Sequence, residues 1–243
     1  MPPQKMLLPL KDYNPTRRTS YVTIILIVIN VAVFLYQGVL SKQPFQVSIA
    51  QSALVPYEIT HGKNVSIPLE TNHDQTIMLK RTISPFLSIL TSIFMHGSLL
   101  HIFGNMLFLW IFGNNIEDQL GVIKYLLFYL ACGIGASLIH VLIYRNSMIP
   151  VIGASGAISG IMGAYLILFP HAKIRTLVFI FILITFVDLP ASLFLIIWFL
   201  FQFLYAGSSS GVAWGAHVGG FIIGIILIKL LRNKHKPIVE FLP

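Results

Sequence analysis

The sequence predicts an all-α, polytopic membrane protein with six membrane-spanning helices. Of its 243 residues, 56% are hydrophobic and only 10% are charged, and the mean hydropathy is +0.83. Apolar runs long enough to cross a hydrocarbon core of about 30 Å recur along the chain. The formal net charge is +8, but the basic residues gather beside these runs. Such flanking charge is typical of membrane orientation, so we expect a lipid bilayer around the chain and no nucleic-acid partner.

Six apolar segments are expected to cross the bilayer, since about 20 residues are needed for each crossing. They lie at about 21–40, 97–115, 122–144, 154–170, 188–206 and 212–231. The run from Leu177 to Tyr205 is too long for one straight span. Because Asp188 and Pro190 interrupt it, the fifth crossing is placed after Pro190 and the stretch before it in the inner interface. Residues 42–96 are expected to form a folded or interfacial insertion on the outer side.

The positions of Lys and Arg set the expected orientation. They fall before the first span, between the fourth and fifth, and after the sixth: Lys5, Lys11, Arg17, Arg18, Lys173, Arg175, Lys229, Arg232, Lys234 and Lys236. An even number of crossings puts these three segments on one side, expected to be the cytoplasm. The chain then consists of a cytoplasmic N-terminal segment (1–20), a six-helix membrane domain (21–231) and a cytoplasmic tail (232–243). Without a convincing organelle signal, we expect the cell membrane of a prokaryote.

Polar residues inside the spans are the candidate functional groups, because such groups are costly in a bilayer. His101 and Asn105 lie four residues apart in the second span and therefore on one helical face. Ser155 opens the fourth span among residues too small to cover it, and His217 lies near the start of the sixth. These three spans run in the same direction, so all four side chains are expected in the outer half of the membrane.

Small residues predict how the fourth and sixth spans pack. They recur at four-residue intervals in both segments, as Gly156 and Gly160 and as Ala216, Gly220 and Gly224. This small-xxx-small pattern allows two helices to approach closely. The contact is expected to bring Ser155 to His217.

A serine and a histidine at the same depth favour acyl-transfer chemistry. Ser155 is the candidate nucleophile and His217 its candidate base, because a serine hydroxyl needs a base within hydrogen-bond reach. The candidate groups for stabilising the tetrahedral oxyanion are His101, Asn105, the backbone amide of Ser155 at a helix N-terminus, and Gly153. Since no carboxylate lies at this depth, we predict a Ser-His dyad.

Other interpretations of the polar residues were weighed against this one. Several histidines share the outer half, but there is no HExxH pair and Cys132 is the single cysteine, so neither a metal nor a nucleotide cofactor is expected. A transporter would have intramembrane charges and internal repeats, which the sequence lacks. Ser159 is interpreted as bonding a carbonyl, His96 as bracing the outer loop, and Trp198 as lipid-facing bulk.

Together these motifs resemble the rhomboid family of intramembrane serine proteases. The resemblance covers about residues 85–231. It rests on the order and spacing of the His96, His101 and Asn105 pattern, the Asn115-Ile-Glu117-Asp118 turn, the Gly153-Ala-Ser155-Gly156 motif, and Ala216-His217 with Gly220 and Gly224. The chain departs from some bacterial members in having no Trp-Arg pair in the first loop and no seventh span.

The resemblance implies a rhomboid-like bundle with Ser155 as nucleophile, His217 as base, and His101 and Asn105 at the oxyanion site. It implies cleavage of single-pass transmembrane proteins near the outer face, with small residues at the cleaved position. The fifth span, which contains Trp198, and the loop after it would then gate substrate access. The alternative is a catalytically inactive relative with a binding or quality-control role, which the presence of both Ser155 and His217 disfavours.

Overall fold

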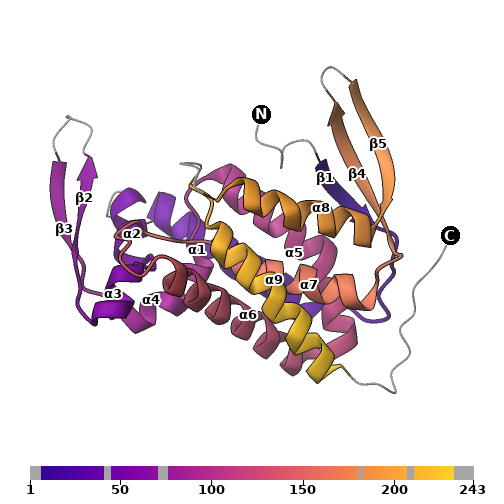
Figure 1. Cartoon of the computed structure of the whole chain (residues 1–243), viewed down its shortest axis with the longest axis horizontal. Coiled ribbons are helices and arrows are strands. Elements are labelled where there is room, and N and C mark those ends of the chain that lie inside the picture. The colour runs from indigo at the N-terminus through magenta and orange to yellow at the C-terminus, as the bar shows by residue number, and fades with distance from the viewer. Residues whose placement is uncertain (1–6, 41–44, 71–75, 181–182, 207–210, 233–243) are drawn as a thin grey trace.

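The computed structural model describes residues 7–40, 45–70, 76–180, 183–206 and 211–232, and it is mostly helical there (Figure 1). The helical elements are α1 (Tyr21–Leu35), η2 (Tyr36–Leu40), α2 (Phe45–Ser52), α3 (Pro56–His61), α4 (Pro85–Thr91), η3 (Ser92–Phe94), α5 (Leu99–Leu120), α6 (Val122–Ile143), α7 (Ser155–Leu168), α8 (Ala191–Leu204) and α9 (Trp214–Leu231). The strands are β1 (Leu7–Asp12), β2 (Ser66–Glu70), β3 (Thr76–Lys80), β4 (Lys173–Ile180) and β5 (Leu183–Pro190). Most of the predicted tail and of the loop after the fifth span lies outside the described residues.

Each predicted span coincides with a helix. Four of these helices are long and apolar enough to cross a membrane: α1 with its continuation to Gly38, α5, α6 and α9. The other two, α7 and α8, have 14 residues each, or about 21 Å of helix. The fold is therefore a helical membrane bundle with several spans, and the count of six crossings stays a prediction.

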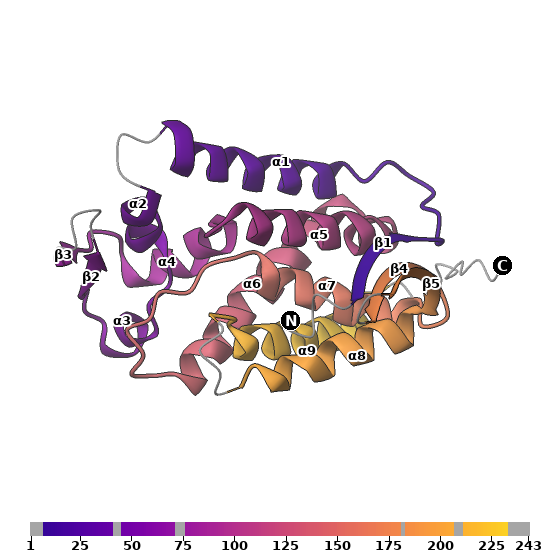
Figure 2. The same cartoon turned by 90° about the horizontal axis from the view of Figure 1, so that it is seen from above.

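The short helix α7 occupies the centre of the bundle. It packs against α5, α6, α8 and α9, and 11 of its 14 residues are buried. In the view from above, α1 and α5 lie on one side of α7, and α8 and α9 lie on the other (Figure 2). Because other helices enclose α7, it need not match the thickness of the lipid. The start of α7 can therefore lie inside the protein, below the membrane surface.

The insertion between the first two spans is folded. It comprises α2, α3, the β2–β3 hairpin, α4 and η3. Its centre is a buried ion pair in which Nη2 of Arg81 lies 3.3 Å from Oε2 of Glu58. The same guanidinium donates to the carbonyl of Ala53, and Oε1 of Glu58 accepts from the amide of Val65. The insertion lies at one end of the molecule (Figure 1).

A three-stranded antiparallel sheet lies at the opposite end, in the order β1-β4-β5 (Figure 1). The stretch before Pro190 was expected only to lie in the interface, and it proves to be the β4–β5 hairpin. An exposed ion pair between Arg175 and Asp188 joins its strands. The amide of Ala191 then donates to the carbonyl of Ala172, which places the start of α8 against the start of β4. The hairpin therefore connects α7 to α8, and β1 pairs with the free edge of β4.

The segment that was expected to form a turn at Asn115 to Asp118 is instead the last part of α5. The helix continues because Glu117 is buried and satisfies the start of α1: its carboxylate accepts from the amides of Val22 and Thr23 and from the hydroxyl of Thr23. The first amides of a helix have no intrahelical partner, and a carboxylate also complements the positive end of the helix dipole. The expectation of a turn was therefore wrong.

Candidate active site

Ser155 is the first residue of α7, and the chain before it is held by the outer insertion. Val151 pairs with Leu54 in both directions, and the amide of Gly153 donates to the carbonyl of Ser92 at 2.9 Å. Gly153 has a φ of 125°, a backbone conformation that residues with a side chain rarely adopt. This conformation turns the chain into α7. As in any α-helix, the first amides of α7 have no intrahelical partners.

His217 lies in the first turn of α9, where its amide donates to the carbonyl of Ala213. The small residues of α7 and α9 bring the helices into direct contact, as their spacing predicts. Nε2 of His217 consequently lies 2.8 Å from Oγ of Ser155, 62 residues away in the sequence. A hydroxyl and an imidazole nitrogen at this distance are hydrogen-bonded, and the imidazole can accept the hydroxyl proton.

Gln202 on α8 is a second partner of His217 that the sequence reasoning missed. Its Oε1 lies 2.8 Å from Nδ1 of His217, and its side chain is fully buried. Trp198, one turn earlier on α8, places its ring 5.9 Å from the ring of His217. The interpretation of Trp198 as lipid-facing bulk was therefore incomplete. A glutamine inside the otherwise apolar fifth span was the sequence feature that pointed to this contact.

His101 lies close to Ser155 and faces Gly153. Ser98 caps α5 by accepting from the amide of His101. The amide of Gly97 donates to Nδ1 of His101, so the proton of a neutral ring is on Nε2. A Cβ atom built on Gly153 would lie 2.8 Å from that Nε2 and 3.5 Å from Oγ of Ser155. The absence of a side chain at Gly153 thus leaves an N–H donor beside the serine.

The remaining predicted site residues have structural contacts. Asn105 donates from Nδ2 to the carbonyl of His101, one turn back. The amide of Gly153 is occupied by Ser92, so it is not free to meet an oxyanion in this structure. His96 is buried, with its ring 5.0 Å from that of His101. Ser159 donates to the carbonyl of Ser155, as its structural interpretation expects.

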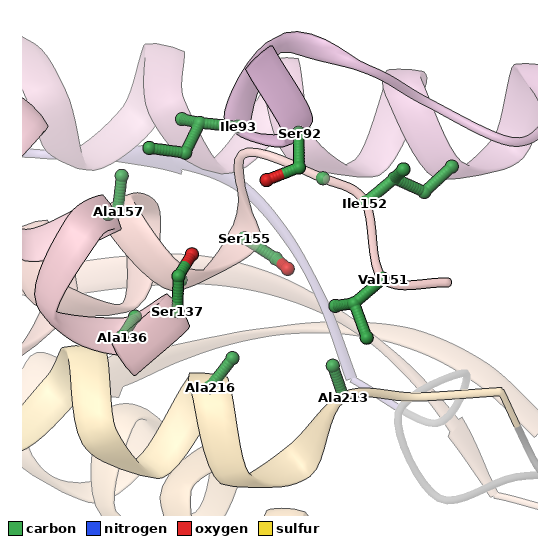
Figure 3. Close-up of a pocket in the computed structure, with 13 residues that line it drawn as sticks. Ser92, Ile93, Ala136, Ser137, Val151, Ile152, Ser155, Ala157, Ala213 and Ala216 are labelled. Carbon is green, nitrogen blue, oxygen red and sulfur yellow. The ribbon is translucent and has the colours of Figure 1, made fainter. Parts of the chain in front are cut away.

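A small pocket adjoins Ser155. Its volume is about 20 Å³, which is close to the space for one water molecule. Figure 3 shows the side chain of Ser155 inside it, between Ser92 and Ile152 on one side and Ala213 and Ala216 on the other. The wall is made largely of small residues: Gly133, Ala136, Ser137, Gly153, Gly156, Ala157, Ala213 and Ala216. Only a small group fits beside the hydroxyl.

Within the described ranges, His, Cys, Asp and Glu side chains form no group of three that could hold a metal ion, and we assign no metal ligands. Fold and site together define a helical membrane protein that carries a hydrogen-bonded serine and histidine within its bundle. The chain belongs to the rhomboid family. The family model described as Rhomboid domain matches residues 84–234.

Similar proteins come from several groups of organisms. Over 161 residues the chain is 32% identical to "Rhomboid protein 1, mitochondrial" of Saccharomyces cerevisiae, which covers 62% of this chain and 43% of that protein. It is 28% identical over 170 residues to "Rhomboid-like protein 11, chloroplastic" of Arabidopsis thaliana, an alignment that covers 65% of this chain and 57% of that protein. It is 41% identical over 78 residues to "Rhomboid protease GluP" of Bacillus subtilis, an alignment that covers 32% of this chain and 15% of that protein. The chain thus spans less than two thirds of each of these relatives.

Proposed function

We propose that this protein is an intramembrane serine endopeptidase that cleaves transmembrane segments of single-pass membrane proteins near the outer membrane face. The observation that carries the proposal is the 2.8 Å contact between Nε2 of His217 and Oγ of Ser155 at the partly buried start of α7. Membership of the rhomboid family supports it, as does similarity to a relative named as a protease.

The chemistry is acyl transfer in two stages. His217 accepts the proton of Ser155 as Oγ attacks the scissile carbonyl, and the tetrahedral intermediate collapses when His217 gives that proton to the leaving amine. Water then attacks the acyl ester, with His217 again as the base, and releases the new carboxyl terminus. Water must reach this site from the outer side of the membrane.

The oxyanion of the intermediate needs donors that are already in place. Nε2–H of His101 and the backbone amide of Ser155 are the proposed donors. Asn105 is a proposed secondary donor, because its amide nitrogen keeps a second proton after bonding its own helix. Gly153 contributes space rather than a proton, since its amide is occupied.

The small pocket supports a preference for small residues at the cleaved position. A volume of about 20 Å³ holds about one water-sized group, so the substrate residue placed there is proposed to be glycine, alanine or serine. The substrate segment must also unwind locally, because a regular helix engages its carbonyls in its own hydrogen bonds.

For topology, we propose that the sheet end of the molecule faces the cytoplasm. Lys11, Arg175 and Lys173 lie in the strands at that end, while the outer insertion lies at the other. This assignment keeps residues 1–20 and 232–243 on the cytoplasmic side of a prokaryotic cell membrane, with residues 21–231 as the catalytic domain. Reporter fusions at both termini test it, and a reporter that is active only outside the cytoplasm would contradict it.

Cleavage of tagged single-span substrates by purified protein in liposomes tests the activity. We expect wild type to cleave within the transmembrane region, Ser155→Ala and His217→Ala to be inactive, and a chelator to have no effect. Cleavage that survives Ser155→Ala would contradict the serine mechanism. Substrate binding without cleavage by the wild type would favour the inactive, quality-control alternative.

A further inference from the structure

Gln202 contacts His217 on the side of the ring away from Ser155. Its Oε1 lies 2.8 Å from Nδ1 of His217, and its Nε2 lies 2.8 Å from the carbonyl oxygen of Trp198. We propose that Gln202 is a positioning residue that fixes the tautomer and orientation of His217, so that the site is a hydrogen-bonded Gln-His-Ser triad in which only His217 and Ser155 exchange a proton. This inference rests on the proposed function.

The orientation of the Gln202 amide follows from the backbone. A carbonyl oxygen can only accept a hydrogen bond, so the side-chain nitrogen of Gln202 must face the carbonyl of Trp198. The oxygen of the same amide then faces His217. The assignment of O and N, which is ambiguous for an isolated glutamine, is thus determined by Trp198, one turn away on the same helix.

The orientation of the amide determines the tautomer of the imidazole. The amide oxygen carries no proton, so Nδ1 of His217 must be the donor in their hydrogen bond. In the neutral ring Nε2 is then unprotonated, and it is this nitrogen that lies 2.8 Å from Ser155. A histidine in the other tautomer would present an N–H to the hydroxyl and could not accept its proton.

A neutral amide suits this position better than a carboxylate. The Gln202 side chain has no exposed surface, and an ion there would lose its hydration. The amide dipole still stabilises the imidazolium that forms when Ser155 gives up its proton. In aspartate-containing triads the carboxylate has the same two tasks, and loss of the correct tautomer there costs about 10⁴ in kcat.

The contacts of Gln202 and Trp198 with His217 come from one helix, α8. Trp198 and Gln202 lie four residues apart on α8, and the Trp198 ring lies at 33° to that of His217. The other titratable groups near His217 are His101 from α5 and His140 from α6. Gln202 and Ser155 hydrogen-bond to the two nitrogens of the His217 ring through their side chains.

Two substitutions separate positioning from packing. Gln202→Met keeps the length of the side chain and removes the acceptor for Nδ1 of His217, whereas Gln202→Glu keeps an acceptor there. Gln37→Met is the matched control, because Gln37 is a buried glutamine at the end of the first span whose amide has no hydrogen-bond partner within the described residues. All variants are purified full-length, and their cleavage kinetics are measured in liposomes across a range of pH.

We expect Gln202→Met to lower kcat by about 10- to 100-fold, with KM changed by less than about 3-fold, since the loss affects proton transfer rather than substrate binding. Gln202→Glu keeps an acceptor for Nδ1 but presents an oxygen to the carbonyl of Trp198, so its activity should lie between those of Gln202→Met and the wild type. Where the introduced carboxyl group is ionised, the acidic limb of the pH profile should move to higher pH, because a carboxylate favours the imidazolium. Gln37→Met should match the wild type. Full activity of Gln202→Met, with an unchanged pH profile, would overturn the inference.

Nitrogen NMR of ¹⁵N-histidine-labelled protein gives a readout that does not depend on cleavage. The His217 signals, assigned by their loss in His217→Ala, should show protonation at Nδ1 in the wild type and a mixture of tautomers in Gln202→Met. Protonation at Nε2 in the wild type would overturn the inference even if the enzyme is active. If wild type does not cleave, or Ser155→Ala does, the proposed function fails, and the spectrum still decides the role of Gln202.

Discussion

Gly224 on α9 packs directly against the backbone of Gly160 on α7. A Cβ atom built on Gly224 would overlap the carbonyl oxygen of Gly160, and one built on Gly220 would overlap that of Gly156. These two contacts set the distance between the helices that carry Ser155 and His217. The small-residue spacing therefore determines the geometry of the site as well as the packing of the bundle.

Replacement of Gly224 by alanine should consequently separate α7 from α9. The clash is with backbone, which a change of rotamer cannot relieve, so we expect a loss of about 1–3 kcal/mol or more in the free energy of unfolding. Thermal unfolding in detergent measures it. Gly104→Ala is the matched control, because an added Cβ there meets no atom within 4 Å. Equal stability of the two variants would contradict the packing argument.

His101 and Asn105 should differ in their effects on catalysis. Loss of a preorganised oxyanion donor costs about 10²–10³ in kcat, which we expect for His101→Ala. Asn105→Ala should cost less than about 10-fold, because the amide of Asn105 already donates to its own helix. Steady-state cleavage of one substrate by both variants makes the comparison. A larger loss in Asn105→Ala would reverse the proposed assignment.

The ion pair inside the outer insertion should be sensitive to the loss of one partner. Burial lowers the pKa of Arg81, and Glu58 opposes that shift; both side chains are fully buried. Arg81→Met leaves the carboxylate of Glu58 without its counter-charge and should cost about 3–5 kcal/mol. The double variant Arg81→Met with Glu58→Gln should recover part of this loss, which a double-mutant cycle of unfolding temperatures measures. No recovery in the double variant would contradict the prediction.

Asp12 should make the anchoring of β1 depend on pH. Its carboxylate accepts from Tyr165 on α7 and Asn115 on α5, yet burial raises its pKa from 3.8 to about 6. The folded protein then binds the proton more tightly than the unfolded chain does. The contribution of Asp12 to stability is therefore fully present below the pKa that Asp12 has in the unfolded chain, and it is lost as the pH rises through about 6.

Asp12→Asn removes this titration and keeps most of the shape of the side chain. Relative to that variant, the wild type should lose about 1–2 kcal/mol of unfolding free energy between about pH 4 and pH 7, with allowance for the partial exposure of Asp12. Unfolding temperatures of both proteins across this range provide the measurement. A wild type that gains stability relative to Asp12→Asn as the pH rises would show the opposite sign.

Much of the fold was predictable from hydropathy, charge and residue spacing. The start of α8 after Pro190 and the contact of Ser155 with His217 followed from chain length, charge and the spacing of small residues. The β4–β5 hairpin did not, because a short apolar run reads alike as a buried strand or a helix. The continuation of α5 past Asn115 depends on the contact of Glu117 with α1, which sequence spacing does not reveal.

The candidate site was predictable in its Ser155–His217 pair and in the neighbouring His101, but not in Gln202. His217 and Ser155 were identified because polar residues are rare in spans and these two share a depth. The depth argument compared only the second, fourth and sixth spans, which run in the same direction. Gln202 lies on α8, the fifth span, which runs in the opposite direction, so it was not included. Its contact with His217 depends on the rotation of α8 about its axis, which tertiary packing determines.

The central claim is that Ser155 is a nucleophile activated by His217. Labelling with a fluorophosphonate probe, followed by mass spectrometry, tests it without any substrate. We expect the wild type to be labelled at Ser155 alone, Ser155→Ala to remain unlabelled, and His217→Ala to react at least about 100-fold more slowly. Label on another serine such as Ser159, or labelling of Ser155 that is unaffected by His217→Ala, would contradict the account.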